Sequence, residues 1–470
     1  MGPPFYVATL PTLRESYGMK STSLVTTALE KIGSVDHSGY ELKSVLALAP
    51  DAMEKAAEFD KSIDGLPLAG IPILLKDNIE AVGLPATAGS LALADTAVTK
   101  DSTIANRLRK AGAVIIGATN LSEWANIRSD RSTSGWSAVG GLTANPWKHA
   151  HSAGGSSSGS GAAVAADLTQ WAIGGETDGS IICPASLNGC VGIKPTVGTI
   201  PRDGVIPISK SQDTPGPMAQ TVAQAALLLD VLTNQNHFVS AAQSQTQVRF
   251  GVVNQWMTLD DRVNALFEDS LNALSRQGAK IVRVDLVQPS QANNDDELSV
   301  MLLELVTGLT EYLALRPGAR VRDLRDVVNF NITNANLELS YFGQELFEKA
   351  LELASSRSNF IGARERNLSW ANQLLDTGLA NVDVLLGCTY GPAWVSTLGK
   401  GDNFGSASWI TTAPAVAGTP IGTVPMGLVD GLPVGLGLVV GRNHDEILVN
   451  AMAQVERALN LGVMRPTFIK

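Results

Sequence analysis

The sequence of 470 residues predicts an α/β fold, built as one domain that spans residues 1–470. Apolar, strand-like runs alternate with amphipathic helical segments early in the chain, and the alternation continues past its middle. Hydrophobic residues make up 44% of the chain and charged residues 17%, which is enough apolar material for a large buried core. No internal repeat and no Pro-rich or charged linker interrupts the chain, so we expect a single domain rather than several.

The first predicted elements alternate between helix and strand. Apolar residues recur at helical spacing over 23–32 and 51–59, and "LAGIPILLKDNI" (68–79) then forms an apolar run typical of a buried strand, with Lys76 at its end. Ser102 is placed to cap a following helix that Gly112 ends, and "AVIIGATN" (113–120) predicts another buried strand.

The second half of the chain continues the same pattern. One helical stripe consists of Val263, Leu266, Phe267, Leu271 and Leu274. It is followed by "KIVRVDLV" (280–287), which alternates like a half-exposed strand, and residues 293–375 are predicted to be mostly helical. Strands return at "NVDVLLG" (381–387), "PIGTVPMG" (420–427) and "PVGLGLVV" (433–440), before a final helix that begins near His444.

Charge and composition exclude several classes of function. The chain has 35 Lys and Arg against 45 Asp and Glu, a formal net charge of -10, and no dense basic cluster, so a nucleic-acid partner is not expected. No apolar stretch reaches the roughly 18 to 20 residues that span a bilayer. The first residues, "MGPPFYVATLPTLRESYG" (1–18), lack the pattern of a signal peptide, which favours a cytoplasmic protein, although a chain that begins after a removed leader would look the same.

Few residues are arranged as metal ligands or as a disulfide framework. Cys183, Cys190 and Cys388 are scattered and fit no usual zinc spacing, so we expect buried, free thiols. His149 and His151 could share one face of an extended strand, but no third ligand is evident. Neither a metal ion nor an organic cofactor is expected.

The stretch "AHSAGGSSSGSGAAVAA" (150–166) allows four interpretations. A flexible linker would join independent domains, yet a predicted helix and an apolar strand follow this stretch directly. A phosphate-binding loop needs a lysine after its second glycine, and none follows nearby. "GSSSG" (155–159) matches the short G-x-S-x-G elbow of α/β-hydrolases, which would make Ser157 a nucleophile with His444 as its base. The fourth interpretation is a loop that places one hydroxyl accurately.

This fourth interpretation links the loop to a lysine and to a second serine. A lysine can act as a base when burial in apolar surroundings lowers its pKa, and Lys76 follows five apolar residues, although such a lysine often reaches the surface instead. In "GGETDGSIICPAS" (174–186), Ser180 directly follows Gly179, where the backbone N–H groups are open to a developing oxyanion.

Six segments together resemble the amidase signature family of serine hydrolases, and the resemblance covers nearly the whole chain. They are "GIPILLKDNI" (70–79), "GATNLSEWANIRSDRSTSGWSAVGGLTANPW" (117–147), "SAGGSSSGSGAAVAA" (152–166), "GGETDGSIICPASLNGCVGIKPTVG" (174–198), "SQDTPGPMA" (211–219) and "AGTPIGTVPMG" with "DGLPVGL" (417–436). The resemblance implies a large central mixed β-sheet with helices on both faces. It also implies a catalytic triad of Lys76, Ser156, which a cis peptide bond precedes, and the nucleophile Ser180.

The mechanism implied by the resemblance is a proton relay. Neutral Lys76 takes a proton from Ser156, which takes one from Ser180 as Ser180 attacks an amide carbonyl. The backbone N–H groups of Thr177, Asp178, Gly179 and Ser180 would hold the oxyanion. The usual family pattern before the nucleophile is Asp-Thr-Gly-Gly-Ser, whereas this chain has "ETDGS", so Asp178 replaces a glycine and is either a contact near the site or solvated.

The expected reaction is hydrolysis of linear carboxamides, because the chain is more similar to bacterial peptide amidases than to the corresponding component of the tRNA-dependent amidotransferase. Motifs that favour this similarity include "YFGQELFE" (341–348) and "GPAW" (391–394), and the helical segment at about 290–375 is expected to shape the pocket. Trp136 and Trp394 could line this pocket or belong to the core. Aryl acylamides or carbamates as substrates, and a subunit of a glutamine-dependent amidotransferase, remain alternatives. The expected partner is a small-molecule or peptide amide, and the expected state is a monomer or homodimer.

Overall fold

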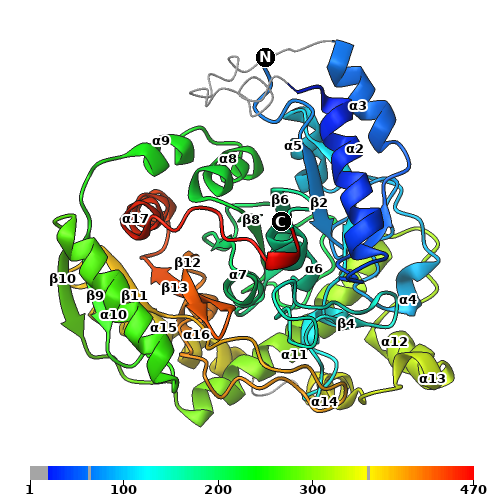
Figure 1. The fold of residues 1–470 in the computed structure, drawn as a ribbon. Coiled ribbons are helices and arrows are strands. Elements are labelled where there is room, and N and C mark those ends of the chain that lie inside the picture. The colour runs from blue at the N-terminus through cyan, green and yellow to red at the C-terminus, as the bar shows by residue number, and fades with distance from the viewer. Residues whose placement is uncertain (1–18, 62–64, 357–359, 470) are drawn as a thin grey trace, which may run out of the picture.

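The computed structural model describes residues 19–61, 65–356 and 360–469. The N-terminal stretch considered for a signal peptide (residues 1–18) lies outside the described residues. Within the described part, strands form a central sheet and helices cover both of its faces, as Figure 1 shows. This arrangement confirms the predicted fold class, an α/β protein around a large mixed sheet.

The central sheet has 11 strands in the order β1-β3-β2-β6-β8-β7-β12-β13-β11-β9-β10. In chain order these are β1 (Val45–Leu48), β2 (Pro72–Lys76), β3 (Val114–Thr119), β6 (Trp171–Glu176), β7 (Val191–Lys194), β8 (Thr214–Ala219), β9 (Arg249–Val253), β10 (Lys280–Val284), β11 (Val384–Cys388), β12 (Ile421–Val429) and β13 (Leu432–Val439). β3, β2 and β6 are mutually parallel, and so are β11, β9 and β10, while the remaining pairs are antiparallel. A separate hairpin pairs β4 (Trp136–Ser137) with β5 (Gly141–Leu142).

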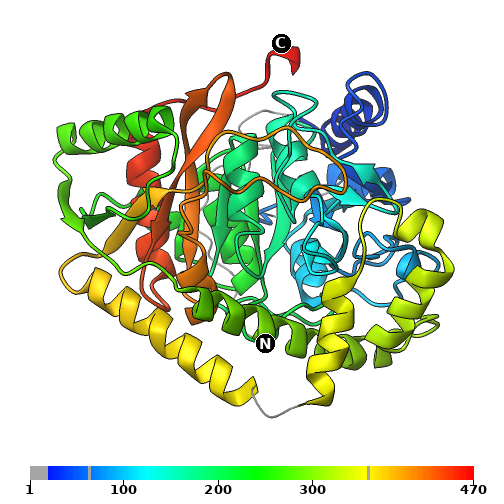
Figure 2. The ribbon, with the colours of Figure 1, turned by 90° about the horizontal axis from the view of Figure 1, so that it is seen from below.

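Helices connect and cover these strands. They are α2 (Ser21–Lys31), α3 (Ala52–Lys61), α4 (Leu91–Ala94), α5 (Thr103–Lys110), α6 (Ser158–Ala165), α7 (Ile182–Asn188), α8 (Val222–Thr233), α9 (Phe238–Gln243), α10 (Asp261–Arg276), α11 (Gln291–Ala314), α12 (Leu324–Thr333), α13 (Ala335–Glu338), α14 (Glu345–Ser355), α15 (Phe360–Leu379), α16 (Thr412–Ala417) and α17 (Asp445–Leu459). α11 packs against α14 and α15, and these helices lie together along one side of the molecule, green-yellow to yellow in Figure 2.

Most predicted elements form where the sequence places them. β2 ends at Lys76 as expected, and the Ser102 side chain accepts a hydrogen bond from the backbone N–H of Ala105 at the start of α5. β10 forms where predicted, as the edge strand of the sheet, but its residues are all exposed or partly exposed and do not alternate between buried and exposed as expected. β1 and the π-helical turn η1 (Ile32–Asp36), which prolongs α2, were not predicted, since both are too short to have a clear period.

Strand register brings three segments to one edge of the sheet. Because β2 and β6 are parallel, with Leu75 opposite Ile173, their carboxyl ends meet at the same edge. β8 runs antiparallel to β6 with Thr214 opposite Glu176, so the residue before β8 also lies at this edge. Lys76, the loop after Glu176, and Asp213 therefore come together although they are far apart in the sequence.

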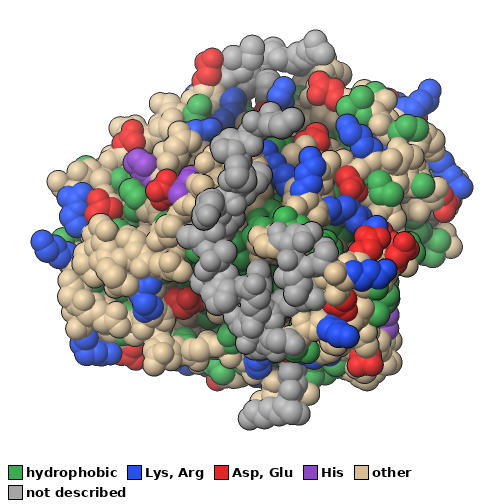
Figure 3. Space-filling view, turned by 90° about the horizontal axis from the view of Figure 1, so that it is seen from above, with side chains coloured by type: hydrophobic (Ala, Val, Ile, Leu, Met, Phe, Trp, Pro, Cys, Tyr) green, Lys and Arg blue, Asp and Glu red, His purple; other side chains and the backbone are tan. Residues whose placement is uncertain are grey.

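No dense basic cluster was found in the sequence, and one face of the molecule can be compared with this in Figure 3. In the view of Figure 3, Lys and Arg side chains are interspersed with Asp and Glu on the visible face. Among the described residues, no helix is both long and apolar enough to cross a membrane.

Candidate active site

Lys76 lies at the carboxyl end of β2 and is almost completely buried, with 1% of its surface exposed. Its Nζ donates hydrogen bonds to Ser156 Oγ at 2.7 Å and to the carbonyl oxygen of Gly175 at 2.9 Å. Burial lowers the pKa of Lys76 to about 7, although the negative charges of Asp213 and Glu176 oppose this shift. A lysine of this kind is partly neutral at physiological pH and can accept a proton.

Ser156 stands just before α6, in the Gly- and Ser-rich stretch singled out in the sequence. It is fully buried, and the peptide bond between Gly155 and Ser156 is cis. The backbone N–H of the next residue, Ser157, donates to the carbonyl oxygen of Ser180 at 3.1 Å. This bond ties the Ser156 segment directly to the backbone of the second candidate serine.

Ser180 ends the short loop between β6 and α7, and 8% of its surface is exposed. Gly179, before it, has a left-handed φ of 74°, and a Cβ at this position would lie 2.5 Å from the Tyr390 hydroxyl oxygen, so the turn requires glycine. Behind the loop, Glu176 Oε2 accepts hydrogen bonds from the backbone N–H groups of Ile181 at 2.7 Å and Ile182 at 3.0 Å. These bonds fix the start of α7 relative to β6.

A second buried carboxylate, Asp213, holds the other side of this loop. Its Oδ1 accepts a hydrogen bond from Thr177 Oγ1 at 2.6 Å, and its Oδ2 accepts from the backbone N–H groups of Ile208 and Ser209 at 2.7 and 2.9 Å. Asp213 also lines the small cavity that contains Lys76, Ser156 and Thr177. The side chain therefore contacts the loop before Ser180 and faces the buried lysine.

Ser180 opens onto a cleft of about 330 Å³. Its polar lining comes from the loop before Ser180 and from the chain near Asn126 and Asp402, and its apolar wall comes partly from α11 and α14. The lining residues are Ala125, Asn126, Ile127, Ser129, Asp130, Ser132, Thr177, Asp178, Ser180, Ile208, Leu298, Met301, Leu346, Asp402 and Phe404. The helical segment predicted to shape the pocket thus contributes Leu298, Met301 and Leu346.

The two tryptophans considered for the pocket lie in different places. Trp136 is buried and packs edge-on against Tyr341 and Phe342, with ring centroids 5.5 and 5.0 Å apart, so it belongs to the core. Trp394 packs edge-on against Phe404 at 5.2 Å, and Phe404 lines the cleft. Trp394 therefore supports the cleft through its neighbour.

The residues of the esterase-type alternative do not form a comparable site. The hydroxyl of Ser157 donates to the carbonyl oxygen of Gly175 at 3.0 Å and accepts from the N–H of the same residue at 3.1 Å, so it is fully engaged by β6. His444 is exposed just before α17. The three cysteines are buried and free, as expected.

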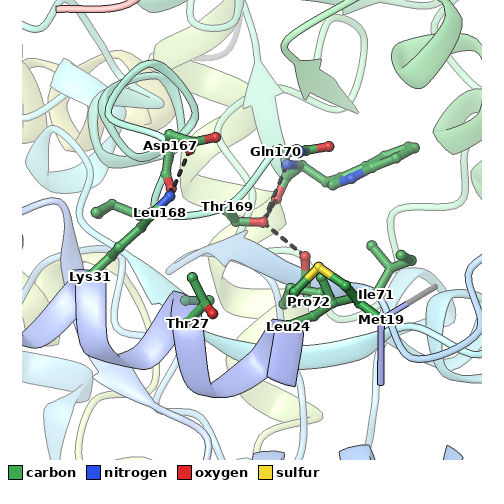
Figure 4. Close-up of a pocket in the computed structure, with 12 residues that line it drawn as sticks. Met19, Leu24, Thr27, Lys31, Ile71, Pro72, Asp167, Leu168, Thr169 and Gln170 are labelled. Carbon is green, nitrogen blue, oxygen red and sulfur yellow. Dashed lines mark hydrogen bonds and ion pairs between the residues drawn. The ribbon is translucent and has the colours of Figure 1, made fainter. Parts of the chain in front are cut away.

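Another cavity, of about 200 Å³, lies away from these residues and is drawn in Figure 4. It is lined by α2 and by the start of β2 at Pro72, which is the strand end opposite to Lys76. Lys31 spans one end of it and forms an ion pair with Asp167 at 2.7 Å. None of the residues predicted to be catalytic lines this cavity.

No role for Asp213 or Glu176 was predicted from the sequence. Both residues lie in segments that carry the family resemblance, "SQDTPGPMA" (211–219) and "GGETDGS" (174–180), and these motifs were the signal that could have found them. Their roles became visible only when the register of β6 and β8 placed the two carboxylates on either side of the loop 177–180.

Comparisons with known proteins identify relatives that match most of the chain. The family model described as Amidase matches residues 23–449. The crystal structure of the native peptide amidase from Stenotrophomonas maltophilia superimposes with a TM-score of 0.90 at 41% identity, covering 97% of each chain. Mandelamide hydrolase of Pseudomonas putida is 40% identical over 282 residues, but this match spans only 55% of that protein and 58% of this chain. A glutamyl-tRNA(Gln) amidotransferase component of Methanococcoides burtonii is 30% identical over 97% of both chains.

Proposed function

The chain belongs to the amidase family and is an amide-hydrolysing enzyme, and we propose that it converts linear carboxamides, peptide C-terminal amides among them, to an acid and ammonia. In this proposal Lys76 is the general base, Ser156 relays the proton, and Ser180 is the nucleophile. The reaction proceeds through an acyl-enzyme on Ser180, and water then releases the acid.

The proton moves along the side chains in a fixed order. Neutral Lys76 Nζ accepts the proton of Ser156 Oγ, which accepts the proton of Ser180 Oγ as Ser180 attacks the amide carbonyl carbon. The carbonyl oxygen becomes an oxyanion, for which the backbone N–H groups of Thr177, Asp178, Gly179 and Ser180 are the proposed donors. Ser156 then protonates the leaving nitrogen as the carbon–nitrogen bond breaks, and the Lys76 ammonium returns its proton to Ser156. Ammonia is released, Lys76 is neutral again, and Ser180 is left acylated.

The contact between Lys76 Nζ and Ser156 Oγ at 2.7 Å carries this proposal. Burial sets the pKa of Lys76 at about 7, and no charged side chain among the described residues lies within ion-pair distance of it. Its Nζ donates hydrogen bonds to the hydroxyl group of Ser156 and to the carbonyl oxygen of Gly175. A general base works best when its pKa lies near the working pH, because it is then both neutral and basic enough to take the proton.

The proposed substrate class rests on similarity and on the cleft. Likeness to the peptide amidase of Stenotrophomonas maltophilia extends over 97% of both chains and supports a carboxamide at the end of a peptide. The apolar wall of Leu298, Met301 and Leu346 offers a surface for an aliphatic or aromatic side chain of the acyl part.

A second candidate is a component of an amidotransferase assembly, which would pass ammonia to a partner instead of releasing it. The match to the amidotransferase component of Methanococcoides burtonii, over 97% of both chains, favours it. The activity of the isolated chain distinguishes the two, because such a component would show little glutamine or amide hydrolysis without its partners.

The test is ammonia release by the purified chain from a peptide C-terminal amide, with its free acid as a blank, and from glutamine, an anilide and a carbamate. Amine release is also measured for the anilide and the carbamate. We expect fast release from the peptide amide that is lost in Ser180→Ala. Turnover confined to the anilide or the carbamate would contradict the carboxamide assignment, and inactivity on every compound would favour the amidotransferase component.

A further inference from the structure

The cleft in front of Ser180 is lined by acidic and not by basic side chains. Its lining includes the carboxylates of Asp130, Asp178 and Asp402, and no Lys, Arg or His among the described residues lines it. A neighbouring cavity of about 180 Å³, which shares Asp178 and Phe404 with the cleft, contains no cationic residue in the described part of its lining either. The candidate nucleophile lines the same cleft, so these carboxyl groups face whatever amide the enzyme binds.

Two of the three carboxylates already have partners or contact water. Asp402 accepts hydrogen bonds from Ser134 on both oxygens, at 3.1 Å from its N–H and at 2.6 Å from its hydroxyl. Asp130 is exposed at the rim, beside the exposed Arg131 and Glu345. A ligand therefore does not have to supply a partner for either of these two carboxylates.

Asp178 differs from both. It lies at the junction of the two cavities, two residues before Ser180, and its Oδ1 is enclosed without a hydrogen-bond donor among the described residues. Burial raises the pKa of Asp178, although the hydroxyl groups of Thr411 and Thr412 and the more distant Lys194 favour its ionised form. An enclosed carboxylate oxygen with no donor is costly unless a ligand supplies one.

A further carboxyl group, that of Glu297, belongs to α11. Glu297 is buried, and its Oε1 accepts a hydrogen bond from Gln212 Nε2 at 2.7 Å. Burial, together with the charge of Asp178, raises the pKa of Glu297 well above its usual range, so this group favours its neutral form. Lys194, the buried cation on the other side, donates to the carbonyl oxygen of Thr419 at 2.6 Å and lines neither cavity. A cation placed beside Asp178 would therefore meet the carboxyl group of Asp178 and, among the described lining residues of the two cavities, no competing cation.

From this geometry we infer that the cleft selects amides whose acyl part carries a cation, an ammonium or a guanidinium group, and that Asp178 is the partner of this cation. The inference rests on the proposed carboxamide hydrolysis, because ammonia as the leaving group leaves only the acyl part to carry the charge. The same carboxylates repel the carboxylate that forms on hydrolysis, so they also favour release of the product.

Two substrate pairs that differ only by an amine test the inference at pH 7. N-acetyl-lysinamide is compared with N-acetyl-norleucinamide, which places the cation on the side chain, and alanyl-norleucinamide with propionyl-norleucinamide, which places it at the N-terminus. In the wild type we expect kcat/KM to be about tenfold or more higher for the cationic member of at least one pair, since a desolvated charge pair is worth roughly this factor. The pair that responds identifies which cation is recognised.

The ratio of kcat/KM within a pair is then measured in Asp178→Asn, where any general loss of activity cancels. We expect the ratio to fall to within about twofold of one, while Asp376→Asn, the same change on the exposed side of α15, keeps the wild-type ratio. Neutral members that react as fast as cationic ones in the wild type, or a preference that persists in Asp178→Asn, would overturn the inference and leave the proposed function intact.

Binding provides a second readout that does not need turnover. The dissociation constants of the same pairs are measured by calorimetry in Ser180→Ala, with and without Asp178→Asn. Tighter binding of the cationic member that disappears with Asp178→Asn supports the inference, and equal binding contradicts it. If the wild type releases no ammonia from any of the four amides, the proposed function fails, and these dissociation constants still decide whether the cleft selects a cation.

Discussion

Thr177 Oγ1 donates a hydrogen bond of 2.6 Å to Asp213 Oδ1, although the two residues belong to different segments of the chain. Thr177 is in the loop that ends at Ser180, and Asp213 precedes β8, which pairs with the strand before this loop. The same carboxylate lines the cavity of Lys76 and raises the pKa of this lysine. One buried side chain therefore both orients the loop of the proposed nucleophile and raises the pKa of the proposed base.

Asp213→Asn is expected to lower kcat by about tenfold to hundredfold with little change in KM. Asparagine replaces one of the two acceptor oxygens by an NH₂ group, so either Thr177 or the N–H groups of Ile208 and Ser209 lose their acceptor. The variant also removes a negative charge near Lys76, which lowers the pKa of the lysine further. The acidic limb of the kcat/KM profile is therefore expected to move to lower pH.

Asp230→Asn is the matched control for this change. Asp230 is a buried carboxylate that accepts hydrogen bonds from the backbone N–H groups of His237, Phe238 and Val239 at 2.9 to 3.0 Å. It lines neither the cleft nor the cavity of Lys76. The Asp230→Asn variant is expected to be less stable than the wild type, but the acidic limb of its kcat/KM profile is expected to lie at the same pH as in the wild type. If the acidic limb of the kcat/KM profile of Asp213→Asn stays at the wild-type pH or moves to higher pH, the role assigned to Asp213 is contradicted.

The pH dependence of the wild type follows from Lys76. Only the neutral amine can accept a proton, and burial sets its pKa at about 7, so kcat/KM is expected to rise with pH through about 7 and to level off above it. Lys76→Arg keeps a positive charge at every accessible pH and is expected to be inactive throughout, while circular dichroism shows a folded protein.

Lys194→Met controls for the loss of a buried lysine. Burial also lowers the pKa of Lys194, to about 8, but its Nζ contacts the carbonyl oxygens of Thr419 and Pro195 and not a serine of the site. We expect the acidic limb of this variant to remain near 7. If the acidic limb of the kcat/KM profile shifts in Lys194→Met, or if the wild type shows no such limb between pH 5 and 9, the assignment of the limb to Lys76 is disproved.

Ser180→Ala is expected to reduce turnover by about 10⁴-fold or more, because the acyl-enzyme cannot form without the hydroxyl. His444→Ala is expected to retain wild-type activity, since His444 is exposed beside α17. Rates are measured as ammonia release from the best amide of the panel. The opposite pattern, with activity in Ser180→Ala and none in His444→Ala, would restore the esterase-type interpretation with Ser157 as nucleophile.

The elements that position the site were predictable from local patterns. β2 and its terminal Lys76 follow from an apolar run that ends in a cation, and α6 follows from the alanine-rich residues after the Gly and Ser stretch. The resemblance to a family then selected Ser156 and Ser180 among many serines, because no property of a single serine distinguishes a nucleophile from a buried structural hydroxyl.

What sequence could not supply was the register between strands that are far apart in the chain. Asp213 lies beside Thr177 only because β6 pairs antiparallel with β8, and Asp178 faces the cleft only because the turn at Gly179 directs the loop towards Tyr390 and Thr411. A carboxylate in a sequence has the same identity whether it is solvated, structural or part of a site, and only its partners in three dimensions separate these cases.

Glu123 and Arg128 form an ion pair that supports one wall of the cleft. Glu123 Oε2 and Arg128 NH2 lie 2.7 Å apart with both side chains fully buried, and Arg128 NH1 donates to the carbonyl oxygens of Phe342 and Gly343 at 3.3 and 3.0 Å. The pair thereby connects the chain next to Ser129, which lines the cleft, to the segment that leads into α14.

Arg128→Met is expected to lower the free energy of unfolding by about 3–5 kcal/mol, because it leaves the Glu123 carboxyl buried without a cation and removes two donors. Glu123→Gln in the same chain is expected to recover part of this loss, since a neutral amide is less costly to bury than an unpaired carboxylate. Urea denaturation of the two single variants and the double variant measures the coupling. If the two losses simply add, the ion pair contributes nothing beyond the separate side chains, and the wall must be held by the packing of Arg128 against Phe342, whose ring centroid lies 4.3 Å from the guanidinium carbon.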